Sequence, residues 1–523
     1  MSPTQAYRRG AIATPHYLAT LAGAEVLSAG GNAVDAILAA NLALGVVAPY
    51  YCGYGGDLLA MVWDGALHAY RSTGRSPAAA SADLVRAELA GGRTGVGEMP
   101  VVGAHTITVP GAVAGWFELI ERFGTRTFGD LARRALVLAS DGFVLTRAGA
   151  FRLAGSTAIP GALGVDDTAL RACYPDVREG GLVVQPALAR TIAALADGGP
   201  DAYYRGPIGA AIAATIAAHG GVMTADDLAA HRAEWVEPLH APFTDAEVYE
   251  MPPPTQGVTA LEMLRLAEAV GIPDDGVERL HLQIEISKLA LADREAFVTD
   301  PAHMSVDPLD LIADDFIARR ARAIDRTRAR PIAPRSMADG GTAYLCCTDG
   351  DGMCVSLIQS NFTAIGSGVH VAEWGINLHN RGASFSLDPT HCNVLAPSKL
   401  PMHTLIPAMV MRDGRPAFVY GTMGGHTQAQ IHLQVLTRLL RDGDDPARAI
   451  DAPRFAVDPA SGVVGIEARV PGAWVDELER RGHAVRPMRP YDDGAGHTHT
   501  IERLDHGWAV AADPRAESAA GGA

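Results

Sequence analysis

The residues of this chain that could carry out chemistry gather around Thr342. Two glycines precede this threonine, and the apolar run 342–348 is typical of a buried strand. A threonine hydroxyl is a weak nucleophile unless a base accepts its proton, and a free α-amino group on the same residue can be that base. Thr342 gains such an amine only if the bond after Gly341 is cut. The pattern alone is compatible with a nucleophile created by chain cleavage, but Gly-Gly-Thr at a strand start is common, and an ordinary strand-edge threonine is the more usual interpretation.

A hairpin is predicted to hold Thr342 in place. Two apolar runs flank the turn sequence Asp349-Gly-Asp-Gly352, which is typical of a β-hairpin. A two-residue loop at the middle of this turn would place Thr342 opposite Gln359. Ser360 and Asn361 would then lie at the same end of the hairpin as Thr342, so that two hydroxyls and an amide converge there.

A second pair of glycines, Gly424 and Gly425, is predicted to follow a strand and precede a helix. Strands are expected at 408–412 and 416–420, and a helix from about residue 428 to 440. A Gly-Gly sequence at this place presents backbone N–H groups at a helix N-terminus. Such groups suit a bound anion or the oxyanion of an acyl-transfer intermediate. A plain strand-to-helix turn is the alternative.

The remaining elements are predicted from hydrophobic periodicity and turn signals. Helices are expected at 20–27, 33–46, 130–138, 185–196 and 281–296, another helix opens at Thr224, and a strand covers 58–63. Residues 325–341 contain four arginines and two prolines and have little to bury, so we expect a mobile surface loop or an interdomain linker there. The tail, 516–523, is expected to fray.

Composition narrows the class of protein. The chain has 523 residues, 48% of them hydrophobic, and a net charge of −16. These values exclude a disordered chain and disfavour binding to nucleic acid or to an anionic membrane. Six cysteines are too few for a disulfide framework in a chain of this length. We see no signal peptide and no apolar stretch long enough to span a bilayer, so a cytoplasmic protein is expected.

Several familiar sites are missing from the sequence. It contains no G-x-S-x-G nucleophile elbow, no P-loop, no H-E-x-x-H and no dinucleotide fingerprint. His497 and His499 could share one side of a strand, but no third ligand is evident, and we interpret them as a polar strand edge rather than a metal site. We therefore expect neither a metal nor an organic cofactor.

Seven sequence blocks spread along the chain, in order between about residue 9 and residue 503, are GVVAPYYCGYGGD, DGGTAYLCCTDGDG, SLIQSNFTAIGSGV, INLHNRGASFSLDP, LPMHTLIPAMV, YGTMGGHTQAQIHLQVL and DAPRF. Together these blocks resemble the γ-glutamyltransferase family of N-terminal-nucleophile (Ntn) hydrolases. The IQSN and NRG-x-x-FSLDP segments are similar to a divergent branch that includes glutathione hydrolase-like and oxamate amidohydrolase proenzymes.

The resemblance implies an α/β fold, a four-layer αββα sandwich of the Ntn-hydrolase type. It also implies that a precursor cuts itself between Gly341 and Thr342. The large piece would be 1–341 and the small piece 342–523, and the two would stay associated as one αββα domain.

The resemblance also implies roles for the residues singled out above. Thr342 would be the nucleophile, and Gly424 and Gly425 would form the oxyanion hole. Ser360 would support the nucleophile, with Asn361 beside it.

The positions that hold the amino-acid end of a γ-glutamyl group in the family are changed here. An aspartate before Phe-Ser is replaced by Ser384, and a Ser-Ser pair is replaced by His403-Thr404. The usual arginine is replaced by a threonine, although Arg75 lies two residues further on. Arg381 is new and could offer a bidentate contact to a carboxylate. The expected substrate-binding residues are Arg75, Arg381, Asn361, Ser384, His403 and Thr404.

The expected function is that of a self-cleaving amidohydrolase or acyltransferase that acts on a γ-glutamyl or similar carboxylate-bearing acyl amide. A small-amide hydrolase of the oxamate type and an unprocessed, non-enzymatic binding protein are the alternatives. The expected partners are a small-molecule amide and the other piece of the same precursor, with no nucleic acid and no membrane; a homodimer of processed pairs is left open. His426, Asp57 and Tyr54 could also line the site, although structural roles are the more ordinary interpretation of each.

Overall fold

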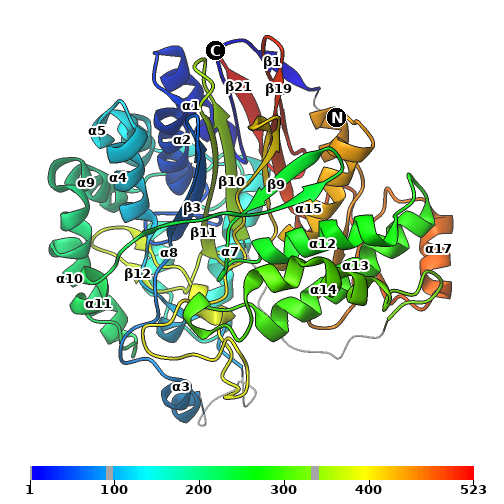
Figure 1. Cartoon of the computed structure of the whole chain (residues 1–523). Helices are drawn as coiled ribbons and strands as arrows, with labels where there is room; N and C mark the ends of the chain where they lie inside the picture. Colours follow the sequence, from blue (N-terminus) through cyan, green and yellow to red (C-terminus); the bar gives the residue numbers. More distant parts are fainter. Residues whose placement is uncertain (1–2, 90–97, 331–340) are drawn as a thin grey trace.

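Two seven-stranded antiparallel sheets packed face to face form the centre of the structure (Figure 1). This computed structural model describes residues 3–89, 98–330 and 341–523. The first sheet has the order β21-β2-β10-β11-β3-β4-β7, with the bounds Ala519–Gly522, Ala11–Thr14, Gly341–Thr348, Cys354–Phe362, Asp57–Trp63, Leu67–Ser72 and Glu234–Val236. The second has the order β1-β20-β19-β15-β14-β9-β8, with the bounds Gln5–Tyr7, Gly507–Ala512, His497–Leu504, Arg415–Met423, Ala408–Arg412, Ala246–Glu250 and Leu239–Phe243.

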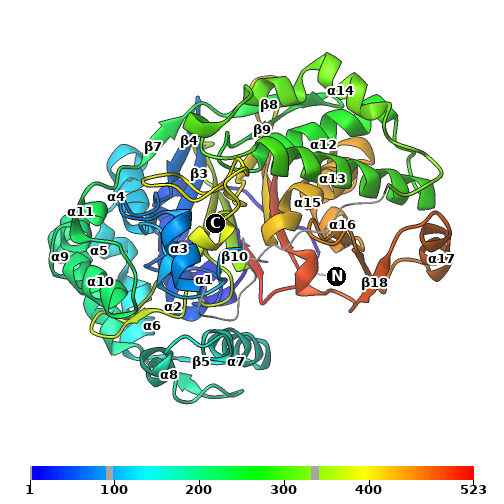
Figure 2. The same cartoon turned by 90° about the horizontal axis from the view of Figure 1, so that it is seen from below.

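Helices cover the outer face of each sheet (Figure 2). Beside the first sheet lie α1 (Tyr17–Ser28), α2 (Ala33–Val47) and α4 (Ala112–Phe123), and α9 (Pro186–Tyr204) packs on the outside of this helix layer. Beside the second sheet lie α12 (Gly257–Val270) and α15 (Gln428–Leu436), with α13 (Val277–Phe297) packed against α12. Separate apolar clusters fill the space between the sheets and the space between each sheet and its helices. The predicted αββα sandwich is confirmed.

The helix α2 follows from a sequence that is apolar on all sides. Every residue of α2 is buried, as the absence of a polar face predicts. Asn32 caps the helix: its side chain accepts a hydrogen bond from the Asp35 amide, and the Asp35 carboxylate bonds back to the Asn32 amide. The loop after α2 leads directly into β3, so this helix fixes the point at which Asp57 enters the sheet.

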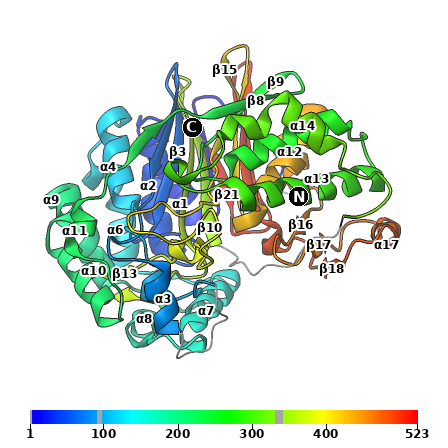
Figure 3. The same cartoon turned by 60° about the horizontal axis from the view of Figure 1, so that its bottom comes forward.

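The contact between the sheets places Thr342 and Gly424 at the same end of the sandwich. A Cβ atom at Gly421 would lie 2.3 Å from the Tyr344 ring, so β15 can approach β10 this closely only because residue 421 is glycine. The next positions on the same faces are Thr342 on β10 and Met423 on β15, and Gly424 follows directly. Figure 3 brings this end of the two sheets forward.

Most of the predicted elements are confirmed. The segments predicted for α1, α2, α9, α13, β3, β14 and β15 carry those elements. The helix predicted at 130–138 is instead two helices, α5 (Phe128–Leu131) and α6 (Arg133–Ser140), which meet at Ala132. The helix after Gly425 continues beyond α15 as a π-helical turn over Thr437–Arg441.

The prediction of a frayed tail is wrong. β21 pairs with β2 along its whole length and forms the edge of the first sheet. Alanine and glycine have low strand propensity, which hides this strand from a sequence pattern. Small residues are needed because a Cβ at Gly522 would lie 2.4 Å from the Gly10 carbonyl oxygen, and one at Gly521 would lie 3.3 Å from Thr20 of α1.

The hairpin register differs by one residue from the prediction. Gln359 pairs with Ala343, one residue beyond its predicted partner. The Asp349 carboxylate accepts hydrogen bonds from the amides of Asp351 and Met353, both at 3.0 Å, and the Asp349 amide bonds to the Met353 carbonyl at 3.1 Å. These bonds close a longer loop than a two-residue turn, which shifts each cross-strand pair by one.

The segment predicted to be a mobile loop is only partly described. Residues 331–340 lie outside the described residues. Residues 325–330 lie at the surface, as expected for a segment with little to bury, and none of them is buried. They are nevertheless hydrogen-bonded to α13 and to the region after α17 (Gly472–Arg480). Across the described ranges, no helix is both long and apolar enough for a bilayer span.

Candidate active site

The hydroxyl of Thr342 meets a serine hydroxyl at the start of β10. Thr342 Oγ1 lies 3.2 Å from Ser360 Oγ, and both residues are fully buried. Ser360 Oγ donates to the Gly341 carbonyl at 2.8 Å and accepts from the Phe362 amide at 2.7 Å. A serine hydroxyl has one proton, which the Gly341 carbonyl receives, so Thr342 is the donor toward Ser360. One serine therefore contacts both the expected nucleophile and the carbonyl that precedes it.

A β-bulge shapes this end of the hairpin. Gly341 pairs with Phe362 while Ala343 pairs with Gln359, so the ladder steps by one residue between them. Asn361 is the inserted residue, and two hydrogen bonds hold it. Its backbone N–H donates to the Tyr51 carbonyl at 3.1 Å, and its side-chain Nδ2 donates to the Pro49 carbonyl at 3.1 Å. Bulges of this kind reorient side chains and are common beside active sites.

The expected oxyanion turn has the backbone geometry that glycine provides. Gly424 has φ +144° and Gly425 has φ +54°, a region that L side chains rarely adopt. The Gly424 carbonyl accepts from both the amide (2.9 Å) and the hydroxyl (2.6 Å) of Thr427. The Gly425 carbonyl accepts from Gln256 Nε2 at 2.9 Å. The turn is thus held from both sides at the start of a helix.

A buried carboxylate stands one strand beyond Ser360. In the ladder Ser360 pairs with Asp57, and alternate residues of β3 face the layer between the sheets, so both side chains point into that layer. One oxygen of Asp57, Oδ2, contacts His403 Nε2 at 3.0 Å, His379 Nδ1 at 3.2 Å and Arg381 Nε at 3.3 Å. Burial alone would raise the pKa of the Asp57 carboxyl, but His379 and His403 hold it well below its usual value.

Arg381 joins this carboxylate to the loop before β14. Its Nη1 donates to Thr404 Oγ1 at 3.2 Å, and its guanidinium carbon lies 4.1 Å from the centre of the Phe362 ring. Burial lowers the pKa of Arg381 to about 10, and burial and the Arg381 charge lower the pKa of His403 to about 4. Within the described ranges, Arg381 Nη2 and Asp57 Oδ1 have no hydrogen-bond partner.

Comparison with known proteins identifies the family. The family profile described as Gamma-glutamyltranspeptidase matches residues 19–523. The chain belongs to the γ-glutamyltranspeptidase family. It is 34% identical to the glutathione hydrolase-like YwrD proenzyme of Bacillus subtilis and 34% identical to the oxamate amidohydrolase proenzyme of Klebsiella pneumoniae, with 98% of each chain covered in both cases. The crystal structure of cephalosporin acylase from Bacillus halodurans superposes with a TM-score of 0.93 and 33% identity, covering 100% of this chain and 97% of that one.

Several residues predicted for this γ-glutamyltranspeptidase-family site lie together. His403, Thr404 and Arg381 form one buried cluster with Asp57. Ser384 lies beside them, and its hydroxyl is 2.9 Å from both the Arg381 and the Met402 carbonyl oxygens. Its single proton is directed to the backbone of the cluster.

Arg75 is held by different partners. Its side chain is 44% exposed, and its Nη1 lies 3.1 Å from Asp300 Oδ2 and 3.1 Å from the Ser398 carbonyl. Its Nη2 lies 3.5 Å from Glu234. Two carboxylates therefore contact this arginine, whereas Arg381 Nη2 has no hydrogen-bond partner among the residues that the structure describes.

Sequence reasoning gave Asp57 little weight and did not consider His379 at all. Asp57 lies 322 to 346 positions from its partners in sequence, so no local pattern could connect them.

Tyr54, also considered as a site residue, has its hydroxyl 3.4 Å from the Leu42 carbonyl and its ring against Trp116, which is a packing role. His426 lies in the short turn that begins the helix after Gly424. In the described part of the chain, no group of three His, Cys, Asp or Glu side chains could hold a metal ion.

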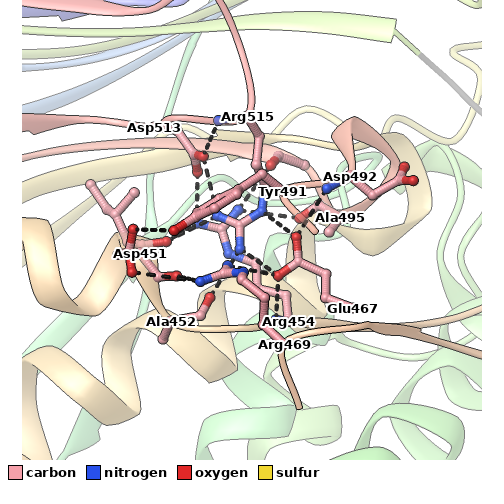
Figure 4. Close-up of polar contacts among 12 residues, drawn as sticks. Asp451, Ala452, Arg454, Glu467, Arg469, Tyr491, Asp492, Ala495, Asp513 and Arg515 are labelled. Carbon is pink, nitrogen blue, oxygen red and sulfur yellow. Dashed lines mark hydrogen bonds and ion pairs between the residues drawn. The ribbon is translucent and has the colours of Figure 1, made fainter. Parts of the chain in front are cut away.

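A buried ion-pair network packs behind the Gly424–Gly425 turn (Figure 4). Arg454 Nη1 donates to the Gly496 carbonyl at 2.9 Å, and its Nη2 lies 2.7 Å from Asp513 Oδ2. Arg515 joins Asp513 to Glu467, with 2.7 Å between its Nη2 and the Glu467 carboxylate. A Cβ at Gly496 would lie 2.3 Å from the Met423 carbonyl oxygen, so this loop packs directly on the strand end that leads into Gly424.

Proposed function

We propose that the protein is a self-cleaving amidohydrolase or acyltransferase with Thr342 as its nucleophile. The observation that carries the proposal is the position of Ser360 Oγ, 3.2 Å from the Thr342 hydroxyl and 2.8 Å from the Gly341 carbonyl oxygen. Membership of the γ-glutamyltranspeptidase family and the structural likeness to cephalosporin acylase support it.

In maturation, Thr342 Oγ1 attacks the carbonyl carbon of Gly341. The hydrogen bond from Ser360 polarises that carbonyl and stabilises the charge that develops on its oxygen. The C–N bond breaks, the proton lost from Oγ1 is taken up by the departing nitrogen, the acyl group moves from nitrogen to oxygen, and an ester forms. Water then hydrolyses the ester, which leaves a carboxylate on Gly341 and a free α-amine on Thr342.

In catalysis, that α-amine accepts the proton of the Thr342 hydroxyl as the oxygen attacks a substrate amide. The oxyanion is stabilised by the backbone N–H groups of Gly424 and Gly425. The amine of the substrate leaves with a proton, and the acyl group stays on Thr342 as an ester. Water, or a second amine, then releases the acyl group and restores the free hydroxyl.

The buried cluster favours an acyl group that carries a carboxylate. Arg381 Nη2 can donate to a carboxylate, and Asp57 Oδ1 can accept from a substrate N–H or ammonium group. Neighbouring strands lie about 4.8 Å apart, so the backbone of Asp57 is about 10 Å from that of Thr342, across Ser360. An amino-acid group several bonds from the reacting carbonyl, as in a γ-glutamyl amide, spans this separation.

A second candidate is hydrolysis of a small amide of the oxamate type. The relative named oxamate amidohydrolase proenzyme is as similar to this chain, at 34%, as the glutathione hydrolase-like relative. The length of the acyl chain separates the two candidates, because in oxamate the carboxylate is attached directly to the reacting carbonyl.

Intact mass under denaturing conditions tests the cleavage. The precursor of 54.7 kDa should give species of about 36 and 19 kDa, in proportion to their lengths, and the smaller should begin with Thr342. The Thr342→Ala variant should remain a single chain. A wild-type chain that stays intact after long incubation would favour the non-enzymatic binding protein, and a Thr342→Ala variant cut at the same bond would remove Thr342 from the mechanism.

A matched pair of substrates tests the acyl group. γ-Glutamyl and glutaryl anilides differ only in the α-amino group, and oxamate serves as the short amide. We expect Arg381→Met to lower kcat/KM for both anilides. Asp57→Asn should lower the preference for the γ-glutamyl over the glutaryl substrate. Rapid turnover of oxamate without turnover of either anilide would instead establish the second candidate.

We further propose that the enzyme works in the cytoplasm and contributes to the metabolism of glutathione-like peptides. All six cysteines are free thiols, and three of them are fully buried in the central hairpin. Free thiols persist in reducing compartments, which supports this location.

A further inference from the structure

Four titratable side chains form a buried cluster remote from the active-site residues in the sequence. Three come from α13, namely His281, Glu285 and Lys288, and the fourth, His483, follows α17. Their exposed fractions are between 0 and 4%. Because α13 precedes the proposed cut and His483 follows it, the cluster joins the two pieces of the chain.

The hydrogen bonds of the cluster run in one direction. Lys288 Nζ donates to Glu285 Oε1 at 3.0 Å and to His483 Nδ1 at 3.1 Å. His483 Nε2 lies 2.8 Å from His281 Nδ1, and His281 Nε2 lies 2.8 Å from the Asp325 carbonyl oxygen. A carbonyl only accepts and an ammonium only donates, so His281 carries its proton on Nε2 and His483 on Nε2. Each ring uses one donor and one acceptor, which requires both imidazoles to be neutral.

This cluster holds the last described residues before the cleavage site. Lys288 Nζ also lies 3.3 Å from the Arg330 carbonyl, and the Arg330 amide donates to Glu285 Oε2 at 2.9 Å. The Ala329 amide donates to the Arg481 carbonyl at 2.8 Å. Residues 325–330 are therefore fixed to α13 on one side and to the chain after α17 on the other.

We propose that these four side chains form a pH-sensitive clamp on residues 325–330. The clamp is closed while both histidines are neutral, and it opens when either histidine binds a second proton. An added proton on His483 Nδ1 would face the Lys288 ammonium, and one on His281 Nδ1 would face the His483 N–H. The clamp is present in the uncut chain, so it goes beyond the proposed enzyme activity and can be tested without it.

The charges around the clamp explain why it stays closed near neutral pH. Lys288 and Arg481 face the two rings and disfavour a further positive charge, whereas Glu285, 3.9 Å from His483, favours one. The Asp325 carboxylate is turned away and accepts from the Thr327 and Arg328 amides. Burial and the Lys288 charge lower the pKa of His483 to about 3, and burial lowers the pKa of His281 as well.

Once the clamp opens, each histidine regains a pKa of about 6.5. Opening should therefore become easier as the pH falls below that value, by up to about tenfold per pH unit for each histidine.

Hydrogen–deuterium exchange of the full chain tests the clamp. The amides of Ala329 and Arg330 should be protected near pH 7.5, and their protection factors, corrected for intrinsic exchange, should fall as the pH is lowered below about 6.5. The double variant His281→Gln/His483→Gln should keep the protection but lose its pH dependence, because the glutamine amide can both donate through its NH2 group and accept through its oxygen and does not titrate. Either a pH-independent protection in the wild type or an unchanged pH dependence in the double variant would overturn the proposal.

Two further variants keep the test decisive if the double variant folds poorly. Glu285→Gln should lower the protection at neutral pH. Glutamine has only one oxygen and no charge, so it cannot accept from both the Lys288 ammonium and the Arg330 amide as Glu285 does. His231→Gln is the matched control, because burial also lowers the pKa of His231 to about 4 and His231 lies beside Ser72 and Tyr204, outside the clamp. A change of the Ala329 and Arg330 protection in this control equal to that in Glu285→Gln would also overturn the proposal.

Discussion

The hydroxyl groups of Thr342 and Ser360 lie 3.2 Å apart on neighbouring strands of the first sheet. The same serine donates to the carbonyl of Gly341, so the proposed nucleophile and the bond that it would cut share one hydrogen-bonding partner. The bulge at Asn361 produces this arrangement, because it brings Phe362 opposite Gly341 and lets the Phe362 amide fix the Ser360 oxygen.

Ser360→Ala should slow self-cleavage by about 10- to 100-fold. The variant removes one hydrogen bond to a developing oxyanion and one to the nucleophile, and a bond to a charged group contributes about 1.5–3 kcal/mol. The time course of the cleaved fraction, followed by intact mass, measures the effect. Ser356→Ala is the control, because Ser356 is buried on the same strand but bonds to Tyr344 and Ala408. Cleavage at the wild-type rate in Ser360→Ala would contradict the assignment.

Gly424→Ala should abolish most of the activity of any cleaved enzyme. At φ +144° an alanine is strained, and its Cβ would lie 2.5 Å from Thr427 Oγ1, so the turn must move. Loss of one oxyanion donor typically costs about 10²- to 10³-fold in kcat. Gly414→Ala is the control, since Gly414 has φ +70° with nothing within 4 Å of its added Cβ. Equal kcat values for the two variants would argue against an oxyanion role for this turn.

Arg454→Met should destabilise the fold by about 3–5 kcal/mol. The change leaves Asp513 with one fewer buried cation and frees the Gly496 carbonyl, and breaking one partner of a buried ion pair has costs of about this size. The free energy of unfolding in urea measures the loss. Arg448→Met, which breaks an ion pair with Asp444 at a side chain 67% exposed, should change it by less than about 1 kcal/mol. Similar losses in both variants would mean that the network of Figure 4 contributes little.

The thermal unfolding midpoint should decrease when the pH is lowered from about 7.5 to about 5. Burial lowers the pKa of His16, His231, His403 and His499 to about 4. The unfolded chain binds protons at these residues near pH 6.5, whereas the folded chain does not. The unfolded state therefore binds more protons in this range, and stability is lost as the pH decreases, by up to about 1.4 kcal/mol per pH unit for each histidine. A midpoint that is unchanged or higher at the lower pH would contradict this account.

The sequence predicts the elements of the site better than their exact alignment. Thr342 at a strand start and the Gly424–Gly425 turn before a helix follow from local patterns, and the structure has these elements where they are expected. The hairpin register was predicted wrongly because the Asp349 carboxylate organises a longer loop. The bulge at Asn361 has no signature in a period-two pattern, and it depends on backbone contacts with residues 49–51.

The cluster around Asp57 was beyond local sequence reasoning for a different reason. Its members lie on β3, on the loop that contains Arg381 and on the loop before β14, and only the completed sheets bring these together. The same limit applies to β21, whose alanines and glycines are selected by close contact with Gly10 and α1 rather than by strand propensity.

The strand order has a consequence for how the protein must be made. In the first sheet, β10, β11 and β21 come from the C-terminal side of the proposed cut and interleave with β2, β3, β4 and β7; in the second, β1, β8 and β9 flank strands from the C-terminal side. Two separately synthesised halves would each expose strand edges that the other should cover, and such edges promote aggregation. Synthesis as a single polypeptide chain gives equal amounts of both halves, and it lets them pair before either half can associate with other chains. Under the proposed cleavage, the bond before Thr342 would hold the two halves together until the sheets are complete and would not be needed afterwards.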